Sequence, residues 1–278
     1  MLDKTELKKI IQNVPLLPMS VTTIINELNK EKIELKKLEK IIAKDPFLTG
    51  RLLASANSPF YGFSGQVNSL NEACMVLGVH SIRNIVLTAG IVENLPAERL
   101  CHFNSEEFWH HSLGTAISAS VIAKKTNHDS EAAFTAGLLH DIGKLILDIH
   151  FNEMFGQVIE YRDKHNCLLI EAEQHVLGVT HADIGALVSL RWKLPKIIIN
   201  VINQYHKPSD GEEDVIVDIV HVASIISRCL EIGDPGDSVT PMLNEKSLKR
   251  LNFTINNLGD AFHDIEILYE KSLSLIST

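Results

Sequence analysis

Residues 136–144 read Ala136-Gly137-Leu138-Leu139-His140-Asp141-Ile142-Gly143-Lys144 and place a histidine beside an aspartate in an apolar segment. The apolar residues on both sides predict that this pair lies inside a packed helix rather than on a solvated loop. A carboxylate next to an imidazole is costly to desolvate unless a partner compensates for the lost water. That partner can be a metal ion or a buried hydrogen-bond network, and the pair alone leaves both open.

The rest of the chain predicts an all-α fold, a bundle of many helices. Apolar residues recur at intervals of three and four, and alternating apolar and polar runs joined by hairpin turns are missing. Early examples of the helical spacing are Leu7, Ile10, Ile11, Ile24, Ile25 and Leu28.

Prolines and capping residues predict where several helices begin and end. We expect Pro15 and Pro18 to close a short first helix. Asp45-Pro46 is typical of a helix start, with aspartate as the N-cap and proline at the first helical position, and Asn57-Ser58-Pro59 is expected to end that helix. Leu194-Pro195 predicts another start, and that helix should stop near His206-Lys207-Pro208.

The apolar period breaks between Leu95 and Asn104. We therefore predict an N-terminal helical subdomain over residues 1–100 and a second helical subdomain over residues 101–278, which carries an acidic C-terminal extension. Residues 210–214 form an acidic segment, which we interpret as a solvated connector. Residues 233–237 form another loop, and because it lacks the EF-hand spacing we expect no calcium there.

Composition and charge narrow the class of protein. The chain has 278 residues, and its 45% hydrophobic content is ordinary for a packed protein. The net charge of -9 argues against nucleic acid as a partner. The four cysteines form no CxxC pair, the first residues lack a signal-peptide core, and no apolar run reaches the roughly 18 residues of a membrane span. We therefore expect a cytoplasmic protein that does not bind membranes.

Histidines are frequent, at 13 in the chain, and several fall in the predicted helices of the second half. Imidazole and carboxylate groups from separate helices can converge on a metal ion in a bundle core. A single histidine in a helix is more often satisfied by a hydrogen bond. The HExxH, GxSxG, P-loop and GxGxxG motifs are absent. The histidines concerned are His110, His111, His140, His181, His206 and His221.

Four stretches of the sequence resemble the HDOD (HD-related output domain) branch of the HD superfamily, which is related to the HD-GYP phosphodiesterases. The likeness covers roughly residues 12–210, and it implies an all-α fold and a bacterial-type regulator of signal transduction. The stretches are 15–20 with 41–46, 52–58 with 73–78, 109–112 with 136–144, and 181–186 with 192–195 and 205–208.

The resemblance also implies a ligand set, because superfamily members that act as enzymes are metal-dependent phosphohydrolases. Their first histidine falls on His111, with His110 as the alternative, and their central pair falls on His140 and Asp141. Additional histidines of two-metal members fall on His181 and His206. A lysine that contacts phosphate falls on Lys144. The metal would be iron, manganese, zinc or magnesium.

This sequence departs from the enzymes at two ligand positions. The distal aspartate falls on Ser224, and one histidine of a double pair falls on Tyr205. A neutral hydroxyl removes a charged oxygen donor, and a tyrosine is protonated at neutral pH because its pKa is about 10. The GYP motif is absent. Asp218 or His221 could substitute by a different rotation of their helix, but a two-metal centre looks incomplete.

Two hypotheses follow. The one we favour is a non-catalytic signalling or regulatory module that binds a partner protein or a small ligand, with the cluster kept as a buried polar network, with or without a structural metal. The other is a metal-dependent phosphohydrolase acting on a nucleotide, a cyclic dinucleotide or a related phosphoester. In that case Asp141 would help to hold the metal and Lys144 would neutralise phosphate charge.

Overall fold

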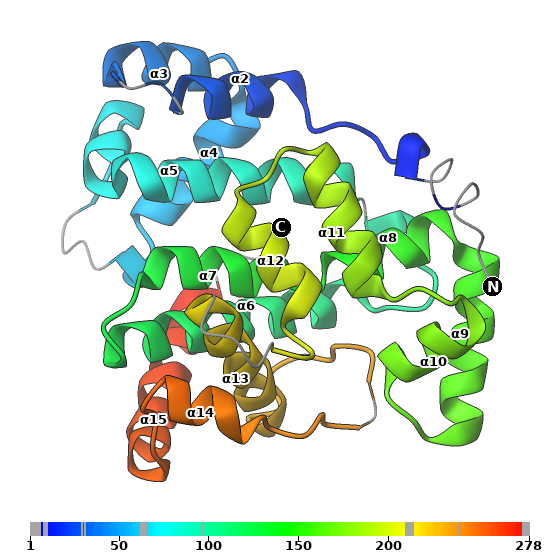
Figure 1. Ribbon diagram of the computed structural model, residues 1–278. Helices are drawn as coiled ribbons and strands as arrows, with labels where there is room; N and C mark the ends of the chain where they lie inside the picture. Colours follow the sequence, from blue (N-terminus) through cyan, green and yellow to red (C-terminus); the bar gives the residue numbers. More distant parts are fainter. Residues whose placement is uncertain are drawn as a thin grey trace. The chain divides into compact units, whose positions relative to one another are not determined.

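The computed structural model contains only helices as regular elements in the part of the chain that it describes, which confirms the predicted all-α class (Figure 1). Most of the acidic segment predicted at residues 210–214 lies outside the described residues. The structure describes residues 7, 11–28, 30, 32–61, 66–95, 97–208, 214–237 and 239–273.

The chain divides into two compact units, and each is described by itself. One consists of Leu16–Asn94 and Glu266–Thr278, and the other of Met1–Pro15 and Leu95–Ile265. The division after Asn94 lies near the break predicted at residues 95–104. The first and last residues are grouped differently from the predicted ranges of 1–100 and 101–278.

In the first of these units, the local sequence signals act as predicted. The Asp45 side chain accepts a hydrogen bond from the Leu48 N–H at 3.1 Å, and Pro46 is the first helical residue. Asn57 is the C-cap of the same helix, and its side chain bonds twice to the backbone of Val67 at 2.9 Å. The elements are α2 (Met19–Leu28), α3 (Leu35–Ile42), α4 (Pro46–Ala56), η1 (Pro59–Tyr61) and α5 (Leu70–Asn94).

Helix α5 is broken within its length at Gly78. Its backbone has φ 70° and ψ 174° there, a non-helical conformation that glycine adopts without steric cost. Among the described helices, α5 alone is long and apolar enough to cross a membrane by length and composition, and 44% of its most apolar window is buried. Core helices pass the same test, so this is weak evidence for a span.

The other unit contains the histidine-rich half of the sequence. Helix α12 begins directly after Pro195 and ends at Gln204, as predicted from its flanking prolines. The elements are η2 (Ala97–Arg99), α6 (Ser105–Lys125), α7 (Ser130–Leu139), α8 (Ile142–His150), α9 (Asn152–His165), α10 (Leu169–Val176), α11 (His181–Arg191), α12 (Lys196–Gln204), α13 (Val215–Cys229), α14 (Glu245–Arg250) and α15 (Ile255–Ser272), which continues past residue 265.

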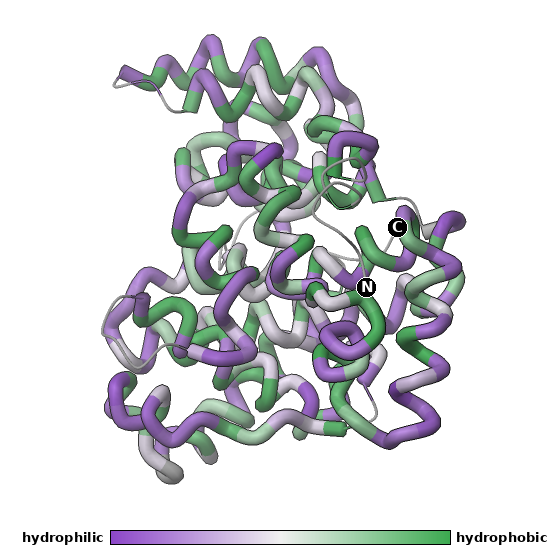
Figure 2. The backbone as a smooth tube through the Cα atoms, turned by 45° about the vertical axis from the view of Figure 1, so that its right-hand side comes forward, coloured by the Kyte–Doolittle hydropathy of each residue, from purple (hydrophilic) through white to green (hydrophobic). Residues whose placement is uncertain are grey.

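Helix α6 is the central element of this unit. Residues 111–123 are buried without interruption, and α6 packs against both α7 and α13. Hydrophobic and hydrophilic positions alternate along the more exposed helices in Figure 2, as expected for helices with one face toward a core. A polar side chain on the buried part of α6 must therefore find its partners inside the protein.

Close packing of α8 against α11 brings two parts of the predicted site together. A Cβ atom on Gly143 would lie 1.9 Å from the backbone oxygen of His181, so only glycine fits at this position. The start of α11 can therefore approach the segment that follows the His140-Asp141 pair.

Candidate functional site

The His140-Asp141 pair lies at the junction of α7 and α8, where His140 caps the end of one helix and Asp141 precedes the other. The predicted position inside a helix is therefore wrong, although both residues are fully buried as expected. The Asp141 side chain does not cap α8, since it makes no hydrogen bond to the backbone of the first turn. Both side chains are instead available to the interior.

His140 presents one unsatisfied nitrogen to this interior. Its Nδ1 donates to the backbone oxygen of Gly137 at 2.7 Å, and its other ring nitrogen, Nε2, faces Asp141. This Nε2 has no hydrogen-bond partner among the described atoms, and it lies 3.3 Å from Asp141 Oδ2. A buried, unpaired polar nitrogen of this kind requires an explanation, because such groups are rare in folded proteins.

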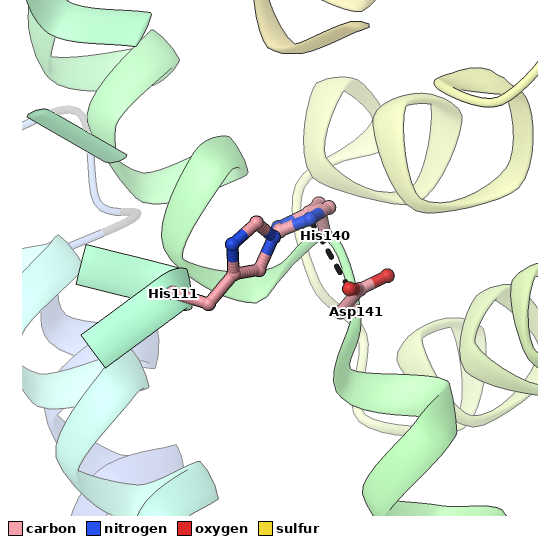
Figure 3. Close-up of side chains that lie close together, drawn as sticks. All are labelled: His111, His140 and Asp141. Atoms are coloured by element: carbon pink, nitrogen blue, oxygen red, sulfur yellow. Dashed lines mark ion pairs between the residues drawn. The ribbon is translucent and has the colours of Figure 1, made fainter. Parts of the chain in front are cut away.

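His111 reaches the same place from α6, as Figure 3 shows. Its ring centroid lies 5.6 Å from that of His140, and its two nitrogens have only long contacts of 3.4 Å, to Thr115 and to Ser227. Burial lowers the pKa of His111 well below its ordinary value, with a further contribution from the charge on His140. His111 is thus a neutral imidazole.

Both oxygens of Asp141 face donors of the chain itself. Oδ1 accepts a short hydrogen bond from the Tyr205 hydroxyl. Oδ2 lies 2.8 Å from the ammonium of Lys144, although it accepts no hydrogen bond of regular geometry. Burial by itself would raise the pKa of Asp141, but the charges of His140 and Lys144 outweigh it and hold that pKa well below its usual range. Asp141 is therefore an anion.

Tyr205 is a neutral phenol. Burial, and then the charge of Asp141, raise the pKa of its phenol well above the ordinary value. It acts as a hydrogen-bond donor at the position where the resemblance implies a histidine.

A second group of ligand-type side chains adjoins Asp141. The Nε2 atoms of His181 and His206 lie 2.7 Å apart, and His181 Nε2 is 3.5 Å from Asp141 Oδ1. On the other side of its ring, His181 Nδ1 contacts the buried carboxylate of Glu173 at 2.7 Å. Burial and the charge on His181 lower the pKa of His206 well below its ordinary value, so His206 is a neutral imidazole.

Lys144, which the resemblance implies as a phosphate contact, is buried inside the protein. The Lys144 side chain is 0% exposed. Besides Asp141, its ammonium contacts the Pro235 backbone oxygen at 2.8 Å and Asp237 Oδ2 at 3.3 Å. Lys144 therefore serves as the internal counter-ion of two carboxylates.

The alternatives left open by the sequence are engaged elsewhere. Asp218 pairs with Arg250, with 2.6 Å between Oδ2 and Nε. His221 Nδ1 donates to the Tyr205 backbone oxygen at 2.8 Å, and its Nε2 accepts from the Asn244 N–H at 3.0 Å. His110 contacts the exposed Glu106, with a separation of 3.9 Å. His111, rather than His110, belongs to the cluster.

The position of the missing distal aspartate is buried on α13. Ser224 is 4% exposed, and Ser227, one turn later, lies 3.4 Å from His111 Nδ1 through its hydroxyl. A serine at either position is neutral and supplies no negative charge.

Two sets among the described residues bring their ligand atoms within 4.8 Å of one another: His111 with His140 and Asp141, and Asp141 with His181 and His206. The first set fits a divalent cation by its donor chemistry, because His140 Nε2 is unpaired and buried. Its obstacle is Lys144, whose ammonium faces the same carboxylate. Together the two sets contain the five residues that the resemblance implied as ligands, and Asp141 belongs to both sets.

Three further residues of the cluster were not predicted. Glu173 supports His181, and Asp237 and Arg228 contact each other at 2.9 Å beside Lys144. Of the three, only Asp237 lies in a segment that the sequence singles out, the loop at residues 233–237.

Comparison with known proteins identifies the family. The sequence profile of the HDOD domain matches residues 14–208. The chain belongs to the HDOD domain family. The match confirms the family and nearly the same range as the resemblance, which was roughly residues 12–210.

Solved HDOD structures share the fold over almost the whole chain. An HDOD domain protein of unknown function from Geobacter sulfurreducens is 25% identical, with a TM-score of 0.78, covering 98% of this chain and 95% of that one. A chain from Shewanella amazonensis, for which a phosphohydrolase activity has been suggested, is 22% identical, with a TM-score of 0.76, covering 97% and 96%. At this identity the second likeness shows the fold alone.

The curated relatives are longer proteins. An uncharacterized protein of Treponema pallidum is 24% identical over 263 residues, which are 91% of this chain and 50% of that protein. Ribonuclease Y of Campylobacter curvus is 30% identical over 126 residues, 45% of this chain and 18% of the enzyme. This HDOD chain therefore spans half or less of the length of these relatives.

Proposed function

We propose that this HDOD chain is a non-catalytic regulatory module that binds a signalling protein or a small ligand. The observation that carries the proposal is the state of Asp141, whose oxygens face the Tyr205 hydroxyl and the Lys144 ammonium. In a hydrolytic metal centre this carboxylate would bind the ion, and an open position would hold the reacting water. Here the Tyr205 hydroxyl donates to one oxygen, and the Lys144 ammonium lies 2.8 Å from the other.

Burial of the cluster supports the same reading. His111, His140 and Lys144 are 0% exposed and His181 is 1% exposed. A phosphoester could contact these side chains only after a part of the surrounding structure had moved. The contacts themselves join α6, the α7–α8 junction, α11 and the end of α12. Contacts of this kind stabilise a fold where the polar groups are satisfied, as Tyr205 with Asp141 and His181 with Glu173 are.

The alternative is a metal-dependent phosphohydrolase, and one observation favours it. The unpaired Nε2 of His140 lies in a set with His111 and Asp141 that could hold a divalent cation. A bound cation would supply Lewis-acid chemistry and lower the pKa of a bound water. Lys144 would then have to leave Asp141 Oδ2, where its charge would oppose that of the cation.

The test combines metal analysis of the purified protein with a screen of phosphoester hydrolysis in the presence of added manganese, iron, zinc or magnesium. We expect no turnover that depends on Asp141. We also expect His111→Ala to lower the free energy of unfolding, because it removes a buried member of the cluster, whereas His110→Ala leaves it nearly unchanged. His110 is the matched control, since it is the neighbouring histidine outside the cluster.

Metal-dependent turnover that Asp141→Asn abolishes in a folded protein would overturn the proposal. Turnover that survives in this variant would instead come from a contaminant or a different site. The thermal melt of each variant establishes that it is folded before its activity is compared.

A further inference from the structure

The loop of residues 233–237, which we call the strap, inserts a carboxylate among three donors. Asp237 Oδ1 accepts from the Leu169 N–H at 2.8 Å. Asp237 Oδ2 accepts from Arg228 Nη2 at 2.9 Å and lies 3.3 Å from Lys144 Nζ. The strap also gives its Pro235 backbone oxygen to Lys144 at 2.8 Å. The Asp237 side chain thus contacts two cationic side chains and one backbone N–H group.

The donors are buried and belong to three different helices. The side chains of Lys144 and Arg228 are 0% and 5% exposed, and they come from α8 and α13. Leu169 is the first residue of α10, where backbone N–H groups are not used by the helix itself. Their geometry is set by packed helices, whereas the acceptor is supplied by a loop between α13 and α14.

The charges of four side chains, Lys144, Arg228, Asp141 and Asp237, balance only with the strap in place. Lys144 and Arg228 are cations, and Asp141 and Asp237 are anions, so the four side chains together are neutral. Burial would raise the pKa of Asp237, but Lys144 and Arg228 hold it well below its ordinary range, so the carboxylate is ionised. Without Asp237, a buried positive charge would lack a counter-ion, which is strongly unfavourable.

We propose that Lys144, Arg228 and the Leu169 N–H form a binding site for a small oxyanion, which Asp237 fills in the structure and which a phosphate or carboxylate group of a ligand occupies when it displaces the strap. Two or more oxygens on one centre are required, because one oxygen faces the Leu169 N–H and another faces the two cations. This inference rests on the proposed ligand-binding function and names the chemistry of the ligand.

Displacement would require the strap to leave several other contacts, since Pro235 is buried and a Cβ atom on Gly233 would lie 2.3 Å from backbone atoms of Glu107 and His111. Arg162 donates to the Gly236 backbone oxygen, and the Asp234 N–H donates to the Glu107 backbone oxygen at 3.2 Å. Asp234 is exposed, and its side chain bonds within the loop to the Gly236 N–H at 2.7 Å. Gly233 and Gly236 have positive φ values of 64° and 80°, which fix the turns of the closed loop.

The experiment measures the binding of inorganic phosphate and of acetate to the whole chain by calorimetry at constant ionic strength. The variants are Asp237→Ala, which empties the place of the carboxylate, and Asp237→Asn, which removes its charge and keeps its volume. Asp260→Ala, at an exposed position on α15, is the control for the same change in net charge. A strap that is closed nine-tenths of the time weakens binding by about tenfold, so Asp237→Ala should bind phosphate about tenfold more tightly than the wild type.

The outcomes are decisive in either direction. Tighter binding by Asp237→Ala that is lost in Asp237→Ala/Arg228→Met supports the site, and the preference between phosphate and acetate identifies the group that it receives. Binding that is equal in the wild type, both Asp237 variants and Asp260→Ala overturns it. A variant that is unfolded in plain buffer is titrated with phosphate instead, where recovery of a cooperative melt supports the site and continued unfolding overturns it.

Failure of the oxyanion site can be told apart from failure of the proposed function. The oxyanion site fails on equal binding constants, whereas the non-catalytic reading fails on metal-dependent turnover. Each failure can therefore occur without the other.

Discussion

Replacing Lys144 by methionine tests whether this lysine is a structural counter-ion. Methionine keeps most of the volume of the side chain and removes its charge, so packing changes little. The ammonium contacts Asp141 and Pro235 at 2.8 Å and Asp237 at 3.3 Å, with no exposure to solvent. Without it, two buried carboxylates lose a shared cation.

The magnitude follows from what remains. Removing one partner of a buried ion pair destabilises a protein by about 3–5 kcal/mol. Asp237 keeps Arg228 and the Leu169 N–H, and Asp141 keeps the Tyr205 hydroxyl. The loss should therefore lie at the lower end, at about 3 kcal/mol of unfolding free energy.

The assay is urea denaturation at neutral pH of the wild type, Lys144→Met and Lys144→Met/Asp141→Asn. The double variant removes both charges and should be less destabilised than the sum of its single changes by about 1–3 kcal/mol. Lys125→Met is the matched control, because Lys125 pairs with Asp264 at 2.7 Å on the surface, where such pairs contribute about 1 kcal/mol or less.

A Lys144→Met protein as stable as Lys125→Met would refute the reasoning. It would mean that the ammonium is not the counter-ion of Asp141 in solution, and the case for a closed site would weaken with it.

Two other predictions concern the same unit. Burial lowers the pKa of His221, so its folded-state pKa lies below the unfolded value. The unfolded chain then binds more protons in acid. The free energy of unfolding therefore falls as pH drops below about 6.5, by up to about 1.4 kcal/mol per pH unit. His221→Gln should flatten this acid limb in urea titrations at several pH values, and parallel limbs would contradict the assignment. Asp148 accepts hydrogen bonds from the backbone N–H groups of Cys101, His102 and Phe103 at 3.0–3.2 Å. Asp148→Asn should therefore lower the free energy of unfolding by about 2 kcal/mol and speed hydrogen exchange at these amides, unlike Asp260→Asn. Unchanged exchange would count against this role of Asp148.

Much of the fold could be read from short segments. Asp45-Pro46 predicted a helix start because both the capping bond and the fixed proline φ depend on neighbouring residues. Pro195 and Pro208 likewise predicted the limits of a helix that runs from Lys196 to Gln204. The burial of His140 and Asp141 followed from their apolar neighbours, but their place at a junction between helices did not.

For the candidate site too, some features followed from the local sequence and others only from the tertiary structure. The sequence by itself determined the helical class, the family and the ligand-type residues, since these depend on local spacing and on motif order. Tertiary structure alone decided that Tyr205 donates to Asp141, that Glu173 supports His181, and that Lys144 meets Asp237 across 93 residues. The physical reason is that a buried charge is satisfied by whichever group the packed helices bring within a few ångströms, and no local pattern records that partner.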